Sequence, residues 1–398
     1  MTADAAAERS DRLLGLAHRL AEEFADRAEQ YDRENRFPFE NFERLKRERY
    51  TALTIPQRFG GLGADLTEFA RCQEELATGC GSTALAVNMH LFALGALGEN
   101  PPHGPQGELL LRTFASSGMI LGGGFTEPEI GGNWGYPTTT AVEEGGIYRI
   151  NGRKAFTSLA PIIDFFVILT SVQHADGSRR IGTFVIPRGT PGIEIVESWD
   201  TLGMRATQSH DVLLRNVAVP AAFLAQERDL GIADEAAVLL FAWFACSIAG
   251  VYTGIARAAR DFAVRYARER RPVVLERPIG HMPGVQFAVA EMDVSLAAMR
   301  ALRDETARAW VEGRIPRDPE GLARVMYPKF FATNQAIAVV STAMGIVGGA
   351  AISKRLPLER YYRDVRAGTF HPLGNDQARE LFGKVALGIG PDTEPRWG

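Results

Sequence analysis

The feature that most constrains the fold is a change of hydrophobic pattern in the middle of the chain. Between residues 119 and 222, apolar residues alternate or gather in short β-rich runs such as 165–169, and Gly or Pro separates the runs. This pattern is typical of the strands of a small barrel or sandwich. On both sides apolar residues recur at helical spacing. The predicted α+β fold comprises an N-terminal helical domain (1–118), a middle β domain (119–232) and a C-terminal four-helix bundle (233–398).

The C-terminal part carries the clearest helical pattern. Helices are expected at 236–267, 286–310, 328–347 and 377–387, which together predict the bundle. The first of them is apolar around most of its circumference, so we expect it to be buried on several sides.

Composition narrows the class of protein. The chain has 398 residues, a net charge of −4, 46% hydrophobic and 23% charged residues, which is typical of a soluble globular protein and argues against a general nucleic-acid surface. The sequence shows no run of eighteen apolar residues and no apolar segment at its charged start, so neither a membrane span nor a signal peptide is expected. Cys72, Cys80 and Cys246 are scattered, and the seven histidines form no ligand motif. We therefore expect a cytoplasmic protein without a metal site.

The stretch 122–158 holds the residues best suited to chemistry. It begins with the loop Thr126-Glu127-Pro128, followed by Gly131-Gly132-Asn133, where proline and glycine favour tight backbone turns. Glu143-Glu144-Gly145-Gly146 then predicts a hairpin, and Asn151-Gly152 predicts a second tight turn. The last strand places Phe156 beside the hydroxyls of Thr157 and Ser158. Taken alone, such a hairpin is most often only scaffold.

The motifs of this stretch resemble the middle domain of the acyl-CoA dehydrogenase superfamily. The shared pattern is TEP, a Gly-rich turn, and then ING-x-K-x-aromatic-x-Ser. The segment 358–366 also resembles the family's P-x-E-R-x-x-R-D-x-R motif, and the resemblance extends from about residue 12 to residue 389. It implies an FAD flavoprotein with a helical N-terminal domain, a middle β domain and a C-terminal four-helix bundle.

The resemblance implies two sets of FAD-binding residues. The isoalloxazine set comprises Phe125, Thr126, Phe156 and Ser158, and the set that holds the pyrophosphate and adenosine of a neighbouring subunit's FAD comprises Arg270, Gln286 and Gly349. Thr126 would bond the pyrimidine side of the flavin, Ser158 would bond N5, and Phe156 would take the place of a stacking tryptophan. A guanidinium such as that of Arg270 suits phosphate oxygens. Because the second set acts between subunits, a homodimer or homotetramer is expected.

The chain departs from the family where the catalytic base is expected. By one count the family's Glu falls on Pro372, and by another on Trp243, and neither residue is a carboxylate. The nearest polar candidates are His371 and Asp376. A histidine with a pKa near neutral could act as the base, with Asp376 orienting it. Alternatively, His371 only packs or bonds near the flavin.

Three functions are compatible with these residues. The first is dehydrogenation of an acyl thioester, bound to CoA or a carrier protein, with hydride transfer to flavin N5 and an electron-transfer flavoprotein as acceptor. The second is a flavin-dependent monooxygenase, which takes reduced flavin from a separate reductase and uses O2. There His371 or Ser158 would form hydrogen bonds to the reacting oxygen. The third is a flavin-binding protein without efficient turnover.

Overall fold

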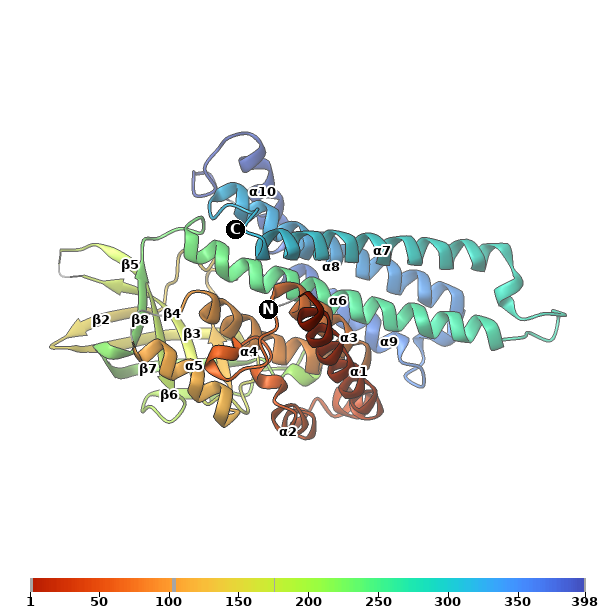
Figure 1. The fold of residues 1–398 in the computed structure, drawn as a ribbon, viewed down its shortest axis with the longest axis horizontal. Coiled ribbons are helices and arrows are strands. Elements are labelled where there is room, and N and C mark those ends of the chain that lie inside the picture. Colours follow the sequence, from red (N-terminus) through yellow and green to blue (C-terminus); the bar gives the residue numbers. More distant parts are fainter. Residues whose placement is uncertain (1–2, 102–104, 175, 397–398) are drawn as a thin grey trace.

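The computed structural model describes residues 3–101, 105–174 and 176–396. Its N-terminal part is helical, a β-sheet follows, and long helices complete the chain (Figure 1). The N-terminal helices are α1 (Ala3–Glu34), α2 (Phe39–Arg47), α3 (Leu66–Gly79), α4 (Gly81–Glu99) and α5 (Pro105–Ser117). The sheet lies at one end of the molecule, and the long C-terminal helices extend away from it toward the other end. The predicted order of helical, β and helical parts is confirmed.

The β part forms one mixed sheet of eight strands, in the order β6-β7-β3-β2-β4-β5-β8, with β1 paired in parallel to β4. The strands are β1 (Leu121–Gly124), β2 (Thr140–Glu144), β3 (Ile147–Thr157), β4 (Phe165–Gln173), β5 (Arg179–Pro187), β6 (Ile193–Val196), β7 (His210–Pro220) and β8 (Leu224–Arg228). The predicted hairpin joins β2 to β3. The second turn predicted at Asn151-Gly152 is wrong, because β3 continues through both residues. A register shift against β7 between Ile150 and Gly152 accommodates them as an irregularity within the strand.

The C-terminal part consists of α6 (Glu235–Glu269), α7 (Pro283–Val311), α8 (Pro319–Val347), α9 (Leu358–Arg366) and α10 (Asn375–Ala386). Helix α8 begins nine residues before the predicted start at Pro328, which lies inside the helix. The true start is Asp318-Pro319, where the Asp318 carboxylate accepts from the Gly321 amide at 2.9 Å. Packing of α8 against α6 and α7 offsets the backbone hydrogen bond that Pro328 cannot donate.

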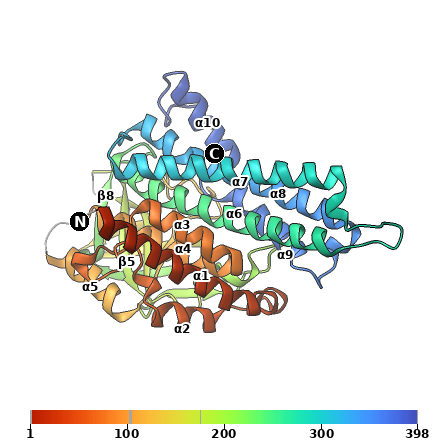
Figure 2. The same cartoon turned by 45° about the vertical axis from the view of Figure 1, so that its right-hand side comes forward.

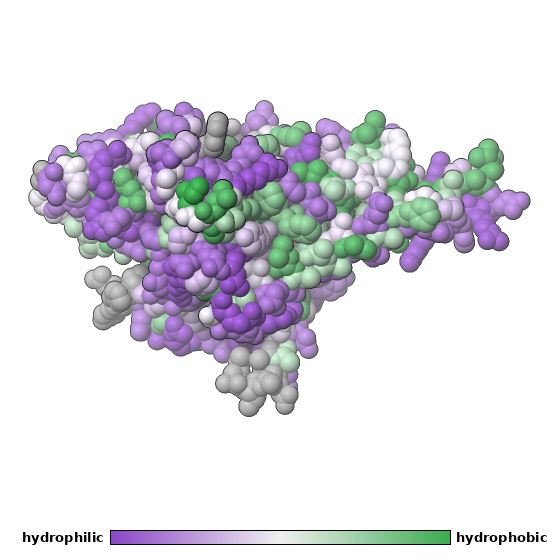
Figure 3. Space-filling model, turned by 90° about the horizontal axis from the view of Figure 1, so that it is seen from above, coloured by the Kyte–Doolittle hydropathy of each residue, from purple (hydrophilic) through white to green (hydrophobic). Residues whose placement is uncertain are grey.

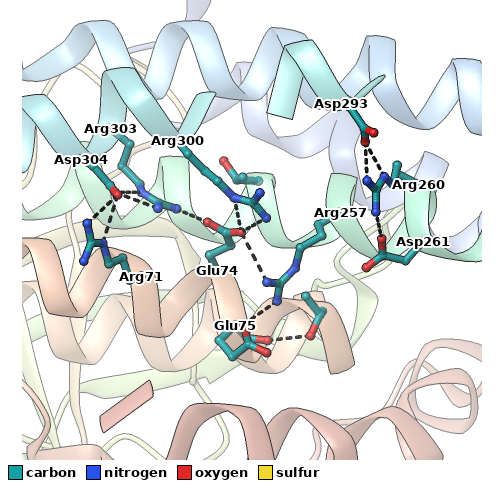
Figure 4. A network of polar contacts seen from close by, with 12 residues as sticks. Arg71, Glu74, Glu75, Arg257, Arg260, Asp261, Asp293, Arg300, Arg303 and Asp304 are labelled. Atoms are coloured by element: carbon teal, nitrogen blue, oxygen red, sulfur yellow. Dashed lines mark hydrogen bonds and ion pairs between the residues drawn. The ribbon is translucent and has the colours of Figure 1, made fainter. Parts of the chain in front are cut away.

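Helix α6 is the central element, as its apolar circumference predicted. It packs against α8, α3, α4 and α7, and most of its length is buried. Figure 2 shows α3 beside α6, with α1 in front of α3. An ionic network joins α3 to α7 beside it (Figure 4). There buried Glu74 accepts hydrogen bonds from Arg300 and Arg303, and Arg71 donates to Asp304 at 3.0 Å.

The surface differs between the two ends of the molecule. Seen from above, the sheet end is mostly hydrophilic, whereas apolar groups gather along the helical end (Figure 3). Exposed apolar side chains there include Val273, Val274, Phe287 and Val294. Helices α4, α6 and α8 are long and apolar enough to cross a membrane by length and composition, although the apolar windows of α4 and α6 are 78% and 94% buried within the protein and that of α8 only 33%.

Candidate active site

A cavity of about 390 Å³ lies where the sheet, α4, α6 and the segment after α9 meet, and we call it the interdomain cavity. Its lining includes four residues of the predicted isoalloxazine set, namely Phe125, Thr126, Phe156 and Ser158, and also His371. The structure thus brings together five predicted residues that are up to 246 positions apart in sequence. Their roles toward a flavin stay predictions.

The TEP loop is fixed to the sheet by a buried ion pair. Lys154 and Glu127 have fully buried side chains, and the Lys154 ammonium donates to Glu127 and to the Leu169 carbonyl. The Glu127 carboxylate also accepts from the backbone amides of Thr138 and Thr139 at 2.6 and 3.0 Å. Although burial opposes ionisation, the Lys154 charge and these donors lower the pKa of Glu127 to about 2. The pair holds the adjacent Thr126 at the cavity.

One side of the cavity presents a chain of hydroxyls. Ser158 Oγ and Ser209 Oγ are 2.7 Å apart, and Ser209 Oγ lies 2.8 Å from Thr207 Oγ1. Thr207 Oγ1 in turn donates to the Met204 carbonyl at 2.9 Å. Because this last bond commits the Thr207 hydrogen, Ser209 donates to Thr207 and Ser158 donates to Ser209, which leaves the Ser158 oxygen as an acceptor toward the cavity.

Large apolar side chains stand exposed at the same cavity. Phe156, Leu202 and Phe370 are 62, 64 and 81% exposed, and all three line it. Phe156 adopts a φ of 55°, which is uncommon for a residue other than glycine, where the pairing of β3 with β7 shifts register. The outward position of Phe156 follows from this local backbone and leaves its ring available to stack on a flat ligand.

His371 is held from two directions. Its Nε2 shares a 2.7 Å hydrogen bond with the Tyr252 hydroxyl on α6, and Lys329 on α8 donates to its carbonyl at 2.7 Å. Lys329 also donates to the Leu373 carbonyl at 2.7 Å. Burial, with a smaller effect of the Lys329 charge, lowers the pKa of His371 to about 3. The imidazole is therefore neutral at physiological pH, so the expected near-neutral pKa of His371 is wrong, while its catalytic role stays a prediction.

The predicted orienting role of Asp376 is also wrong. Its carboxylate is exposed on α10 and pairs with Arg379 at 2.7 Å, while His371 is oriented by Tyr252. Of the two vacant base positions, Pro372 lines the cavity. Trp243 faces elsewhere, because its indole N–H donates to Glu99 at 2.9 Å.

The three predicted pyrophosphate and adenosine residues lie elsewhere. Arg270 follows α6, Gln286 is in the first turn of α7 and Gly349 follows α8. The turn between α6 and α7 lies at the end of the helices farthest from the sheet (Figure 1). None of the three lines the interdomain cavity. Within a single chain, the isoalloxazine set and the pyrophosphate and adenosine set therefore do not share a cavity. This separation is compatible with an FAD that is bound between two subunits.

A second cavity of about 340 Å³ lies between the sheet, α4 and α6, and we call it the sheet-side cavity. Phe125 and Trp134 line both cavities. Trp134 stacks on Phe241 with ring centroids 4.9 Å apart and planes 10° apart. Trp134 was not among the predicted site residues, although a bulky aromatic residue among the glycines of the loop 131–135 is an unusual feature.

Two further residues near the cavity, Tyr252 and Lys329, were not predicted from the sequence. Lys329 is a charged residue within a long apolar stretch of α8, which was the available signal. Tyr252 carried no signal of its own, because its role depends on the position of His371, 119 residues away.

Comparison with known families now identifies the class of protein. Models of the acyl-CoA dehydrogenase N-terminal, middle and C-terminal domains match residues 11–99, 122–217 and 246–375. The chain therefore belongs to the acyl-CoA dehydrogenase family of flavin oxidoreductases, which use FAD.

Relatives within the family have different activities. The chain is 34% identical to the putative acyl-CoA dehydrogenase YdbM of Bacillus subtilis over 362 residues, covering 90% of this chain and 92% of that protein. It is 32% identical to the L-evernosamine nitrososynthase of Micromonospora sp. over 403 aligned positions, covering 96% of this chain and 91% of that protein. The structure of KijD3 in complex with FMN and a dTDP-amino sugar matches with a TM-score of 0.87 at 29% identity, covering 97% of this chain and 95% of KijD3.

The interdomain cavity fits the isoalloxazine of a flavin. The exposed ring of Phe156 provides a stacking surface, and the hydroxyls of Thr126 and Ser158 can meet the polar edge of the ring system. Arg366 lines the same cavity, and its guanidinium lies over the Tyr362 ring, with no carboxylate partner among the described residues. A cation at this place suits the anionic part of a flavin nucleotide.

Proposed function

We propose that this protein is a flavin-dependent monooxygenase built on the acyl-CoA dehydrogenase fold. The observation that carries this proposal is the chemistry of the interdomain cavity. Among the described residues that line it none is Asp or Glu, and its one imidazole is kept neutral. Removal of a carbon-bound α-proton needs a base at this position. Oxygen transfer from reduced flavin and O2 to a substrate heteroatom or ring needs a shielded apolar cavity with hydrogen-bonding groups instead.

The chain's own residues then have defined roles. The TEP loop, anchored by the pair of Glu127 and Lys154, places Thr126 at the flavin, while Ser158 and its hydroxyl chain meet the ring edge. His371, held by Tyr252, offers Nδ1 as the ring nitrogen without a partner among the described residues. The cofactor supplies two electrons, so that one oxygen atom of O2 enters the substrate and the other leaves as water. The nitrososynthase relatives support this class.

Dehydrogenation of an acyl thioester is the second candidate. It is supported by the family itself and by relatives such as YdbM and the cyclohex-1-ene-1-carbonyl-CoA dehydrogenase of Syntrophus aciditrophicus. In this reaction the substrate is an acyl-CoA or acyl-carrier thioester, and an electron-transfer flavoprotein accepts the electrons. Without a carboxylate at Pro372 or Trp243, the turnover of a simple acyl-CoA should be slow by about 10²–10⁴-fold.

Two assays on the flavin-loaded protein separate the candidates. In the first, butyryl-CoA and octanoyl-CoA are mixed anaerobically with the oxidised protein, and bleaching of the flavin is followed. In the second, a flavin reductase with NADH supplies reduced flavin under ¹⁸O2, and a panel of aromatic amines and indoles is analysed for ¹⁸O. The monooxygenase predicts ¹⁸O incorporation and slow bleaching. Rapid bleaching by an acyl-CoA, without ¹⁸O in any product, would establish the dehydrogenase instead.

We also propose that FAD is bound between subunits of a homodimer or homotetramer. The exposed apolar residues Val273, Val274 and Phe287 lie near Arg270 and Gln286 in sequence, in the turn between α6 and α7 and at the start of α7. An interface there would cover these side chains and bring a partner's arginine to the nucleotide. Arg270→Ala should weaken FAD retention without affecting FMN. Equal retention of both flavins, or a monomer by light scattering, would contradict this arrangement.

A further inference from the structure

The hydroxyl chain of Ser158, Ser209 and Thr207 allows a single arrangement of its three hydrogen atoms. Its inner end is the Met204 carbonyl, which lies 2.9 Å from Thr207 Oγ1, and a carbonyl oxygen carries no hydrogen. The hydrogen between these two oxygens therefore belongs to Thr207. By the same count, the hydrogen between Ser209 and Thr207 belongs to Ser209, and the one between Ser158 and Ser209 belongs to Ser158. Because Ser158 Oγ has no second hydrogen, it can only accept a hydrogen bond from a molecule in the interdomain cavity.

Burial protects this arrangement from water. Thr207 is fully buried and Ser209 is only 4% exposed, although both border the interdomain cavity, so little of either hydroxyl is open to another partner. Ser158 is half-buried and lines the same cavity, so its oxygen forms the accessible end of the chain. The residue that a ligand meets is therefore Ser158, while Ser209 and Thr207 determine what Ser158 can offer.

Thr126 presents the opposite case at the same cavity. It is half-buried, and its hydroxyl has no hydrogen-bond partner among the described residues. The hydrogen on its oxygen can turn toward a ligand or away from it, so this hydroxyl can either donate or accept. Thr126 lies close to Ser158 in the fold, because it pairs with Ala155 in an antiparallel bridge. The cavity thus combines one adaptable hydroxyl with one fixed acceptor.

We propose that the hydroxyl chain makes this site selective for the reduced flavin: Ser158 accepts a hydrogen bond from flavin N5–H, and Ser209 is the positioning residue that keeps Ser158 an acceptor. The inference rests on the flavin site of the proposed function and adds redox selectivity to it. On the polar edge of an isoalloxazine, the carbonyl oxygens accept and N3–H donates in both redox states. Reduction by two electrons and a proton, which NADH supplies through the reductase, converts N5 from an acceptor into an N–H donor. An acceptor-only Ser158 therefore stabilises the reduced form and leaves the oxidised N5 without a donor.

The midpoint potential of the bound flavin tests this proposal, because a tenfold preference for the reduced form raises a two-electron potential by about 30 mV. The FAD-loaded wild type and variants are titrated anaerobically against a reference dye. Ser158→Ala removes the acceptor, so the potential should fall by about 20–30 mV, equal to a 5- to 10-fold loss of preference. Ser209→Ala should cause a similar fall, because it frees the Ser158 hydrogen to serve the oxidised N5 as well. Thr126→Val is the matched control and should shift the potential by less than about 10 mV, since an adaptable hydroxyl serves both redox states.

A double variant separates positioning from a merely structural effect. Because Ser209 acts through Ser158, adding Ser209→Ala to Ser158→Ala should lower the potential no further. Additive falls, or a fall of less than about 10 mV for either single variant, would overturn the proposal. Flavin absorbance and far-UV circular dichroism verify that each variant is folded and loaded, and Thr207→Val, which removes the acceptor of Ser209, replaces Ser209→Ala if that variant does not fold.

The outcome is independent of the reaction class, because the potential is measured without substrate or O2. If the predicted falls are found and ¹⁸O incorporation is not, the redox selectivity stands and the monooxygenase assignment fails. If ¹⁸O is incorporated and the potential does not respond to Ser158→Ala, only the redox selectivity fails.

Discussion

The two deeply buried lysines of this protein have opposite surroundings. Lys154 in the sheet and Lys329 in α8 both have fully buried side chains. Lys154 meets the Glu127 carboxylate, whereas the hydrogen-bond partners of Lys329 among the described residues are the carbonyls of His371 and Leu373. Burial lowers the pKa of Lys154 to about 8, even against the attraction of Glu127, and that of Lys329 to about 7.

This difference indicates that the Glu127–Lys154 pair stabilises the fold, whereas Lys329 acts beside the cavity. A buried ion pair with further hydrogen bonds is ionised on both sides and ties distant strands together, at little net gain but with a large penalty if one partner is lost. A buried ammonium with only carbonyl partners has a lowered pKa, here about 7, so it is partly neutral at physiological pH. Lys329 therefore fixes the backbone of the segment 371–373 beside the cavity without an opposite charge, so its protonation can change while the scaffold stays constant.

Breaking the Lys154 pair should have the largest effect on stability. Glu127→Gln leaves the Lys154 ammonium buried without a countercharge, so the free energy of unfolding should fall by about 3–5 kcal/mol in urea titrations. The matched control is Glu129→Gln in the same loop, whose exposed carboxylate should change stability by less than about 0.5 kcal/mol. A loss below about 1 kcal/mol for Glu127→Gln would show that the pair contributes no more than a surface ion pair.

Removing the Lys329 ammonium should have a smaller, pH-dependent effect. Lys329→Met leaves the two carbonyls without a donor, which costs about 1–3 kcal/mol, partly offset because no charge is buried. The folded pKa of about 7 lies below the ordinary value of 10.5, so between these pH values the unfolded chain binds more protons. The stability contribution of this group thus increases with pH over that range.

Urea unfolding at pH 6.5, 8 and 9.5 measures this difference. The destabilisation by Lys329→Met should be smallest at pH 6.5 and grow toward pH 9.5, because only the wild type gains from deprotonation of Lys329. The control is Lys354→Met, at an exposed lysine, whose effect should not vary with pH. A pH-independent difference between wild type and Lys329→Met would mean that Lys329 keeps its ordinary pKa in the fold.

The sequence predicted the scaffold better than the site. Glu127 and Lys154 lie within the TEP and ING-x-K motifs, which predicted a loop and a strand there, but their ion pair was not predicted. The same motifs located Thr126 and Ser158 at one cavity. The β3 strand was interrupted too early at Asn151-Gly152, since residues with turn propensity also occur where a strand changes register.

The surroundings of His371 could not be derived from local sequence. Its partners Tyr252 and Lys329 lie on two other helices, so their contact depends on how α6 and α8 pack. Asp376 was chosen because it is near in sequence, but α10 begins between the two residues and turns its carboxylate to solvent. The pKa of His371 likewise depends on burial, which only the assembled fold determines.

His371→Ala should affect activity far more than stability. In the proposed reaction the imidazole acts as a hydrogen-bonding group, so kcat should fall about 10- to 100-fold, equivalent to one strong hydrogen bond. His281→Ala, at an exposed histidine, is the control and should leave kcat unchanged. With a pKa of about 3, His371 stays neutral from pH 5 to pH 8 and should cause no loss of rate in that range. A wild-type rate loss centred near pH 6.5 that disappears in His371→Ala would restore the role of general base.

Tyr252→Phe should have the smallest effect of these variants, and it tests whether Tyr252 orients the His371 imidazole. It removes the hydroxyl that bonds His371 Nε2 and leaves the backbone contacts from Lys329 in place. Stability should fall by about 0.5–1.5 kcal/mol, because one neutral hydrogen bond is lost in a buried position. If Tyr252 orients the imidazole, Tyr252→Phe should lower kcat in the wild-type background but not in the His371→Ala background. Additive losses in this double-mutant cycle would show that Tyr252 acts on the cavity independently of His371, and Lys329 would then be the residue that positions this segment.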